Sequence, residues 1–230
     1  RGLGDVYKRQ FEQFCGIIRE LRGENGCPWD KVQTHESLIP CMIEEAYEAV
    51  DGIKTLQEGK GWDSLCEELG DVLMQVIFHS QLAEEEGYFT FEDVVDGISR
   101  KMIHRHPHVF GGHTEEKPDW DALKREEHSR QTPEEEIAAV PQALPALIRS
   151  SKVLKKMDKY YGYGSDADET LQELKQKVVQ LEKEQGIPES GETVGDMLLL
   201  LCNYARLKGF NSELLLGKSL EKCLKSYEIQ

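Results

Sequence analysis

Two clusters of acidic residues in the first third of the sequence have the side chains and the spacing of a metal site. The first cluster consists of Glu44, Glu45 and Glu48, and the second of Glu67, Glu68 and Asp71. Residues three or four positions apart share one face of a helix, so Glu45 and Glu48 are expected to point the same way, and so are Glu68 and Asp71. Two such helices packed antiparallel would bring four carboxylates together. Carboxylate oxygens are ligands that Mg²⁺ prefers.

The spacing of these acids is weak evidence by itself, because 43 of the 230 residues are acidic. A pattern of this kind is expected by chance on the order of once in such a chain. The alternative interpretation is that Glu68 and Asp71 border the surface and pair with lysines, since most acidic pairs on helices are solvated. Whether the helices that carry the acids are buried or solvated distinguishes the metal site from the surface pairs.

The helix expected from about Asp63 to Glu86 favours the metal interpretation. One apolar stripe on it consists of Leu65, Leu69, Val72, Leu73, Val76 and Ile77, and a second of Met74, Phe78 and Leu82. On a helical wheel Glu68, Asp71 and Gln75 fall between these stripes, while Glu67 points away. A helix that is apolar on nearly all sides is expected to be buried. Its carboxylates would be carried inward, where a charge needs a partner or a metal.

Apolar residues recur with the period of a helix along the whole chain, and no stretch sustains the alternation of a strand, which predicts an all-α fold. Ser37 is a plausible N-cap for the helix that carries the first acid cluster, with Pro40 in its first turn. That helix is expected to stop near Gly59 to Gly61. Further helices are expected near residues 11–21, 91–102, 119–130, 147–160, 169–184, 194–207 and 212–227.

The chain is expected to contain two units. Residues 1–10 show no apolar periodicity and are interpreted as a junction remnant outside the fold. Pro133, Pro141 and Pro145 punctuate residues 132–146, which are expected to form a linker. The predicted domains therefore cover residues 11–131 and 147–230.

Composition excludes several classes of protein. The net charge of −15 argues against broad binding to a nucleic-acid backbone, which requires a basic surface. No apolar run approaches the roughly 20 residues that cross a bilayer, so no membrane association is expected. Six cysteines without a C-x-x-C pair or paired Cys/His zinc spacing predict reduced thiols in a cytoplasmic protein.

A small basic patch follows the acid clusters. Lys101 and Arg105 are four residues apart at the end of a predicted helix, which suits a phosphate group but also a solvated helix terminus, and the spacing leaves both open. Trp120 either packs in the protein or stacks on a base. The nearby histidines are not expected to bind zinc, because Pro107 interrupts the helix and no cysteine is close. They are His104, His106, His108 and His113.

The second half of the chain repeats the first but loses most of the acids. Residues 70–73 recur as residues 195–198, and Asp196 corresponds to Asp71. The positions of Glu44, Glu45, Glu48, Glu68 and Arg105 are taken by Gln176, Lys177, Gln180, Thr193 and Ser226. The second copy is therefore expected to form no metal site and to serve in packing, dimerisation or regulation.

Four motifs in order give the chain a resemblance to a known family. They are GCPWDK at residues 26–31, EEAYE at 44–48, ELGD at 68–71 and RHPHVF at 105–110. Together they resemble the MazG family of nucleoside triphosphate pyrophosphohydrolases. The resemblance implies tandem all-α helical-bundle domains, a homodimer, and Mg²⁺-dependent hydrolysis of nucleoside triphosphates to monophosphate and pyrophosphate in nucleotide-pool housekeeping, with Mn²⁺ able to substitute.

The resemblance also implies roles for individual residues. Glu45, Glu48, Glu68 and Asp71 would be the metal ligands. Glu44 would be a second-metal ligand or the base that activates water. Lys101 and Arg105 would face the phosphates, and Trp120 would approach the base.

Two rival functions remain as alternatives. Di-iron carboxylate proteins also use acidic helices in a bundle, but their sites need Glu-x-x-His pairs, and here the matching positions hold Asp51 and Met74. The second rival is a non-catalytic, Mg²⁺-dependent nucleotide-binding protein or helical interaction protein, in which the acids are structural.

Overall fold

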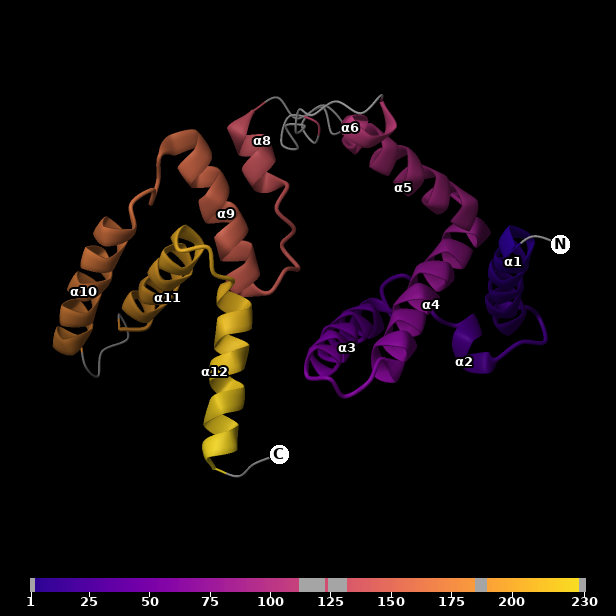
Figure 1. Ribbon diagram of the computed structural model, residues 1–230, viewed down its shortest axis with the longest axis horizontal. Coiled ribbons are helices and arrows are strands. Elements are labelled where there is room, and N and C mark those ends of the chain that lie inside the picture. The colour runs from indigo at the N-terminus through magenta and orange to yellow at the C-terminus, as the bar shows by residue number, and fades with distance from the viewer. Residues whose placement is uncertain (1–2, 112–122, 124–131, 185–189, 228–230) are drawn as a thin grey trace. The chain divides into compact units, whose positions relative to one another are not determined.

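The computed structural model describes residues 3–111, 123, 132–184 and 190–227, with side chains described from residue 8 onward. All regular elements in this part of the chain are helices, so the all-α prediction is confirmed (Figure 1). The chain divides into two compact units, Arg1–Pro118 and Asp119–Gln230. None of the described helices is both long and apolar enough to span a bilayer.

Helix α4 is the centre of the first unit. The helices of this unit are α1 (Leu3–Arg22), α2 (Pro28–Lys31), α3 (Ile39–Gln57), α4 (Asp63–Glu85), α5 (Phe91–Arg105) and α6 (Pro107–Phe110). α3 packs along α4, and α1 and α5 also pack against it (Figure 1). In the core, Ile77, Phe78 and Leu82 of α4 meet Ile18 of α1 and Leu38. The apolar stripes of α4 therefore bury its C-terminal half against its neighbours, as the sequence predicts, whereas Leu69 in the N-terminal half is 53% exposed.

The start of α3 differs in detail from the prediction. Pro40 lies in the first turn as expected, but Leu38 is the N-cap residue and its side chain makes no capping bond. Ser37 instead closes the preceding turn: its hydroxyl accepts from the Thr34 N–H at 2.9 Å and donates to Gln33 Oε1 at 2.7 Å. A serine hydroxyl can hydrogen-bond to the backbone of a turn as well as cap a helix, and here Ser37 bonds within the turn.

Helix α1 begins earlier than the sequence predicts. It includes most of the first ten residues, which the lack of apolar periodicity placed outside the fold. Lys8, Arg9 and Gln10 are exposed, so this part of the helix contributes little to the core. Lysine, arginine and glutamine are good helix formers, and without a proline or a cap in between the helix can extend into a polar segment.

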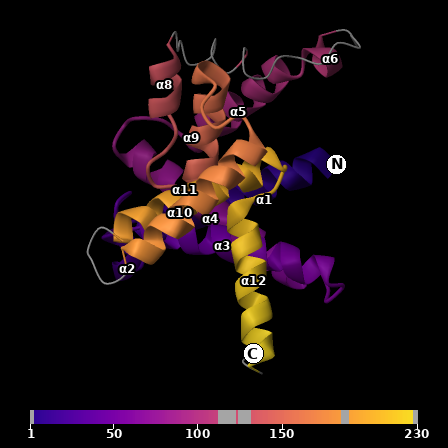
Figure 2. The ribbon, with the colours of Figure 1, turned by 90° about the vertical axis from the view of Figure 1, so that its left-hand side faces the viewer.

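The second unit repeats the arrangement of the first. Its helices are α8 (Pro133–Ala138), α9 (Ala146–Tyr161), α10 (Ala167–Lys183), α11 (Ser190–Leu207) and α12 (Ser212–Ser226). α10 packs along α11 as α3 does along α4, and α9 packs against α11 as α1 does against α4. In Figures 1 and 2, α12 extends away from the α10–α11 pair. The internal repeat seen in the sequence thus corresponds to a repeated helical unit.

The segment 132–146, expected to be a linker, contains helix α8. Pro133 occupies the first turn of α8, where proline is tolerated, and Thr132 and Glu135 form a capping box. Glu136 is 6% exposed and pairs with Lys156 of α9 at 2.7 Å. This ion pair holds α8 against α9. The segment therefore packs as part of the second compact unit and is not an extended linker between the two units.

Candidate functional site

The acid clusters meet because α3 and α4 approach closely. A Cβ atom on Gly52 of α3 would lie 2.9 Å from the Cα of Leu65 of α4, so only glycine fits at this crossing. The short turn between them makes the two helices antiparallel. Residues that precede Gly52 by one and two turns therefore face residues that follow Leu65 by one and two turns. This register places Glu45 and Glu48 opposite Glu68 and Asp71.

Three carboxylates converge at this place. Glu45, Glu48 and Glu68 each offer an oxygen, and these oxygens all lie within 4.8 Å of one another. Glu45 and Glu68 are half-buried and Glu48 is exposed. The cluster thus lies at the margin of the unit and is less enclosed than the apolar flanks of α4 predict. Its neighbours are exposed as well: Ile43 and Tyr47 of α3 and Leu69 of α4 are each about half exposed.

The electrostatics of the cluster favour a bound cation. Partial burial, then the charges of Asp71 and Glu48, raise the pKa of Glu45, and a hydrogen bond with Glu48 adds to this. Partial burial, then the charges of Glu48, Glu67 and Asp71, raise the pKa of Glu68. Repelling carboxylates of this kind are relieved by a divalent ion. An all-carboxylate donor set fits a hard cation such as Mg²⁺.

Asp71, Glu44 and Glu67 lie around this triplet. Asp71 is half-buried and is close enough for its charge to act on both Glu45 and Glu68. Glu67 is exposed, as its place on the wheel predicts. Glu44 is also exposed and is not part of the triplet, so its role stays a prediction.

The predicted phosphate ligands lie elsewhere on the first unit. Lys101 and Arg105 are in the last turns of α5, which begins after the end of α4 that is opposite to the acids. Figure 1 shows α5 turning away from α3 at this point. Lys101 is exposed and Arg105 is half-buried. One copy of the chain therefore does not bring the basic patch to the carboxylates, and Trp120 lies outside the described residues.

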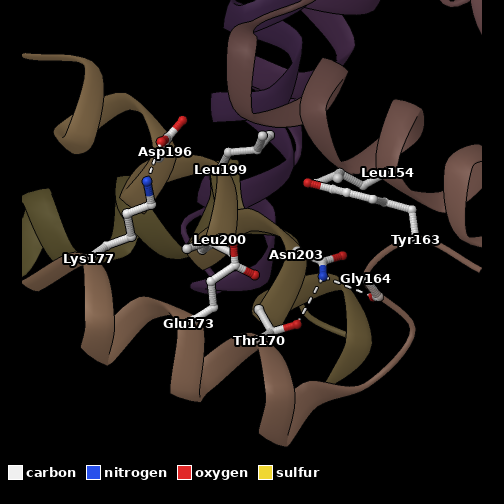
Figure 3. A pocket seen from close by; sticks show the side chains of 10 residues that line it. All are labelled: Leu154, Tyr163, Gly164, Thr170, Glu173, Lys177, Asp196, Leu199, Leu200 and Asn203. Atoms are coloured by element: carbon white, nitrogen blue, oxygen red, sulfur yellow. Dashed lines mark hydrogen bonds and ion pairs between the residues drawn. The ribbon is translucent and has the colours of Figure 1, made fainter.

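The matching place in the second unit holds an internal ion pair. Lys177 of α10, at the position of Glu45, donates to Asp196 of α11, at the position of Asp71, at 2.8 Å (Figure 3). Gln180 donates to Thr193 Oγ1 at 3.1 Å, and Thr193 donates to Glu184 at 2.6 Å. Hydrogen bonding to Asp196 raises the pKa of Lys177 and so keeps the ammonium charged. A cation that belongs to the chain thus neutralises the remaining acid.

One polar pair, which includes His79 two turns beyond Asp71 on α4, is absent from the sequence-based prediction. His35 and His79 stack with ring centroids 5.0 Å apart and planes 7° from parallel, and their Nδ1 atoms are 2.8 Å apart. His79 follows Asp71 by eight residues on the same face of α4. That helical spacing is the signal that could have pointed to His79. The position of His35 depends on the conformation of the turn before α3, which no spacing rule predicts.

The comparisons with known proteins agree with this geometry. Residues 33–110, which contain both acid clusters and the basic patch, match the model of the MazG nucleotide pyrophosphohydrolase domain. The chain is 36% identical over 233 residues to the nucleoside triphosphate pyrophosphohydrolase of Escherichia coli K12, covering 93% of this chain and 84% of that protein. It is 34% identical over 221 residues to the nucleoside triphosphate pyrophosphohydrolase/pyrophosphatase MazG of Thermotoga maritima, covering 95% and 84%.

A third relative is matched over a smaller part of its length. The uncharacterized protein YabN of Bacillus subtilis is 47% identical over 152 residues, which are 64% of this chain and 30% of that protein. The two longer matches extend over both units at more than 30% identity, and the domain match coincides with the carboxylate site. The chain belongs to the MazG nucleotide pyrophosphohydrolase family.

Proposed function

We propose that this chain hydrolyses nucleoside triphosphates to nucleoside monophosphates and pyrophosphate, that the reaction depends on Mg²⁺, and that the first unit carries the site. The observation that carries the proposal is the convergence of Glu45, Glu48 and Glu68 within 4.8 Å, inside the segment that matches the family domain. Relatives at 34–36% identity that bear the name of this activity support it.

In the proposed site Glu45, Glu48, Glu68 and Asp71 hold Mg²⁺, and Mn²⁺ has the same preference for oxygen ligands. The bound ion would neutralise phosphate charge and favour the attack of water on the triphosphate. By holding the cation, the carboxylates of α3 and α4 would determine where the polyphosphate binds. The cation itself would offset the negative charge of the chain at that place. Glu44, exposed beside the cluster, is the candidate to accept a proton from the attacking water.

The basic patch would reach the site from a second copy of the chain. Apolar side chains on α5, among them Val95, Ile98 and Ile103, are exposed. A homodimer that covers them would bring the α5 of one copy to the acid cluster of its partner, so that Lys101 and Arg105 contact the phosphates. Trp120 is proposed to approach the base. We assign the second unit no metal site, because Lys177 occupies the position of a ligand.

A product assay tests the proposal. The protein is incubated with a panel of ribo- and deoxyribonucleoside triphosphates with Mg²⁺, with Mn²⁺ and with EDTA, and pyrophosphate and orthophosphate are measured from the first seconds. We expect pyrophosphate and the monophosphate as initial products, with no turnover in EDTA. Orthophosphate as the first product, or no turnover of any nucleotide, would contradict the proposal. Mg²⁺-dependent binding without hydrolysis would identify a nucleotide sensor instead. A role in nucleotide-pool housekeeping in the cytoplasm is part of the same proposal.

A further inference from the structure

Among the described residues of α4, Gln75 is the one with a buried side-chain polar atom that has no hydrogen-bond partner in the protein. It is 4% exposed, and its Oε1 is buried with no hydrogen-bond partner. Other buried polar side chains of the same helix are satisfied: Ser80 donates to the Val76 carbonyl at 2.8 Å, and Gln81 donates to Glu85 at 3.0 Å. A buried acceptor without a donor is destabilising, so its presence calls for a reason.

The position of Gln75 on α4 relates it to the acid cluster. It follows Asp71 by four residues and Glu68 by seven, which puts the three side chains on one face of the helix within a span of about 60°. This is the face that meets α3 and the acid cluster. An acceptor without a donor therefore lies one turn beyond a proposed metal ligand, on the buried side.

The second unit shows what the same position does when the acids are missing. Counting from the aligned Asp71 and Asp196, the counterpart of Gln75 is Leu200. Figure 3 shows Leu200 in the wall of a cavity that Lys177 and Asp196 also line. The position therefore faces the site, and it is apolar in the copy that has a lysine in place of a metal ligand. The buried amide occurs together with the carboxylate cluster and is lost with it.

We propose that Gln75 is a positioning residue of the metal site: its Oε1 accepts a hydrogen bond from a water molecule in the coordination shell of the cation. The inference rests on the proposed function. Mg²⁺ keeps several of its waters when it binds to proteins. A water whose lone pair is on the metal can only donate, so it needs acceptors around it. Gln75 supplies a neutral acceptor, which orients a water without adding a further negative charge to the cluster.

Removing the acceptor while keeping the volume tests the inference. In Gln75→Met and Gln75→Leu, Mn²⁺ affinity without nucleotide, measured by titration calorimetry, should fall roughly 10- to 100-fold, as for other groups that orient metal ligands. Thermal unfolding in EDTA should stay at the parental temperature or rise, because no buried acceptor is left unpaired. Gln81→Leu is the matched control, since it removes a buried glutamine of the same helix away from the acids. It should keep the parental Mn²⁺ affinity.

Gln75→Glu keeps an acceptor oxygen and should bind Mn²⁺ more tightly than Gln75→Met. The electron paramagnetic resonance spectrum of bound Mn²⁺ should change in Gln75→Met and not in Gln81→Leu, since it reports on the coordination shell directly. Mn²⁺ affinity of Gln75→Met and Gln75→Leu within about twofold of the parent would overturn the inference. Asp71→Asn distinguishes a failure of the inference about Gln75 from a failure of the proposed metal site. If it loses Mn²⁺ while Gln75→Met does not, only the inference falls, and if neither loses Mn²⁺, the proposed metal site falls too.

Discussion

At the scale of residues, the acids of the site differ from the many others in the chain by their neighbours and not by their type. Glu45 and Glu68 have raised pKa values because partial burial and other carboxylates disfavour their charge. Glu85 is also acidic and on α4, but hydrogen bonding to Arg22 lowers its pKa. A carboxylate with a cation of its own is structural, and one surrounded by other carboxylates is available to an external cation.

The first prediction concerns single carboxylates. Glu48→Gln or Asp71→Asn should lower kcat/KM for hydrolysis by at least about 100-fold. Residues that only orient a metal ligand already cost up to about 100-fold when they are replaced, and loss of the ligand itself should cost no less. Initial rates of pyrophosphate release measure this. Asp196→Asn is the control in the second unit and should retain parental rates. A folded Asp196→Asn protein as inactive as Glu48→Gln would refute the assignment of the site to the first unit.

The second prediction concerns the histidine pair. Burial, and then the proximity of His35, lower the pKa of His79. As the pH falls below about 6.5, the ordinary pKa of histidine, His79 binds a proton in the unfolded chain before it does so in the folded one. The contribution of neutral His79 to the free energy of unfolding is therefore complete above that pH. It is lost as the pH falls through the lowered pKa of His79 in the folded protein. The free energy of unfolding should therefore fall between about pH 7.5 and 5.5 by more in the parent than in His79→Phe.

Urea unfolding at several pH values measures this difference, and other groups that titrate in the range cancel in it. The control is His104→Phe, since His104 is an exposed residue of α5. It should follow the parental curve. A His79→Phe curve parallel to that of the parent would show that the pair does not contribute.

At the scale of elements, the site depends on how closely α3 and α4 approach. The crossing at Gly52 sets the distance between the helices and also the register that aligns the acids. In contrast, Gly70 lies on the exposed side of α4, where a Cβ would meet no atom within 4 Å. Gly52 is thus required by close packing between the helices, whereas Gly70 leaves room for a side chain.

The third prediction uses this contrast. Gly52→Ala should destabilise the first unit by about 1–3 kcal/mol, because the added methyl forces backbone apart in a packed crossing. It should also lower activity, since the carboxylates move with their helices. Gly70→Ala should be neutral or stabilising by up to about 1 kcal/mol, because alanine is the better helix former. Chemical denaturation and initial rates measure both. Equal stability of the two variants would show that the α3–α4 crossing can accept a larger residue than glycine at position 52.

The sequence predicts long amphipathic helices better than short or polar ones. α4 is found where its apolar stripes place it, and α11 ends at Leu207 as predicted but begins at Ser190 rather than at Val194. The start of α1 and all of α8 are missed because their residues show no apolar periodicity. α8 is fixed by the Glu136–Lys156 ion pair, a contact between segments twenty residues apart that only the folded chain brings together.

The site could be predicted in part for the same reason. Helical spacing and the repeat are enough to pair Glu45 and Glu48 with Glu68. The exposure of Glu48 could not be predicted, since it depends on which elements cover α3. The separation of Lys101 from the acids depends on the direction in which α5 leaves α4, and that direction is set by tertiary packing.

At the scale of the whole molecule, the two units have similar helices, and both expose apolar surface. Both leave apolar side chains exposed on their last long helix, such as Ile98 on α5 and Leu220 on α12. Exposed apolar surface of this kind is typical of subunit interfaces. The proposed homodimer is therefore the level at which the active site would be completed.

The fourth prediction concerns this assembly. Sedimentation equilibrium should give twice the chain mass of 26.3 kDa. If α5 of one copy completes the site of the other, Glu48→Gln and Lys101→Ala should each be inactive alone. Mixing them should restore roughly a quarter of parental activity, since half of the dimers are mixed and each of these has one intact site of two. The mixture of Glu48→Gln with Asp71→Asn is the control and should stay inactive. Absence of complementation in exchanging dimers would place Lys101 outside the partner's site.

The lysine of the second unit has a consequence for how the chain responds to its surroundings. Lys177 is part of the chain, so it cannot be chelated or replaced by a competing metal, whereas the cation proposed for the first unit would exchange with solution. If the proposed site is correct, a shortage of magnesium would change the charge balance of the first unit and leave that of the second unchanged. The proposed activity would then follow the metal supply, and the fold of the second unit would not.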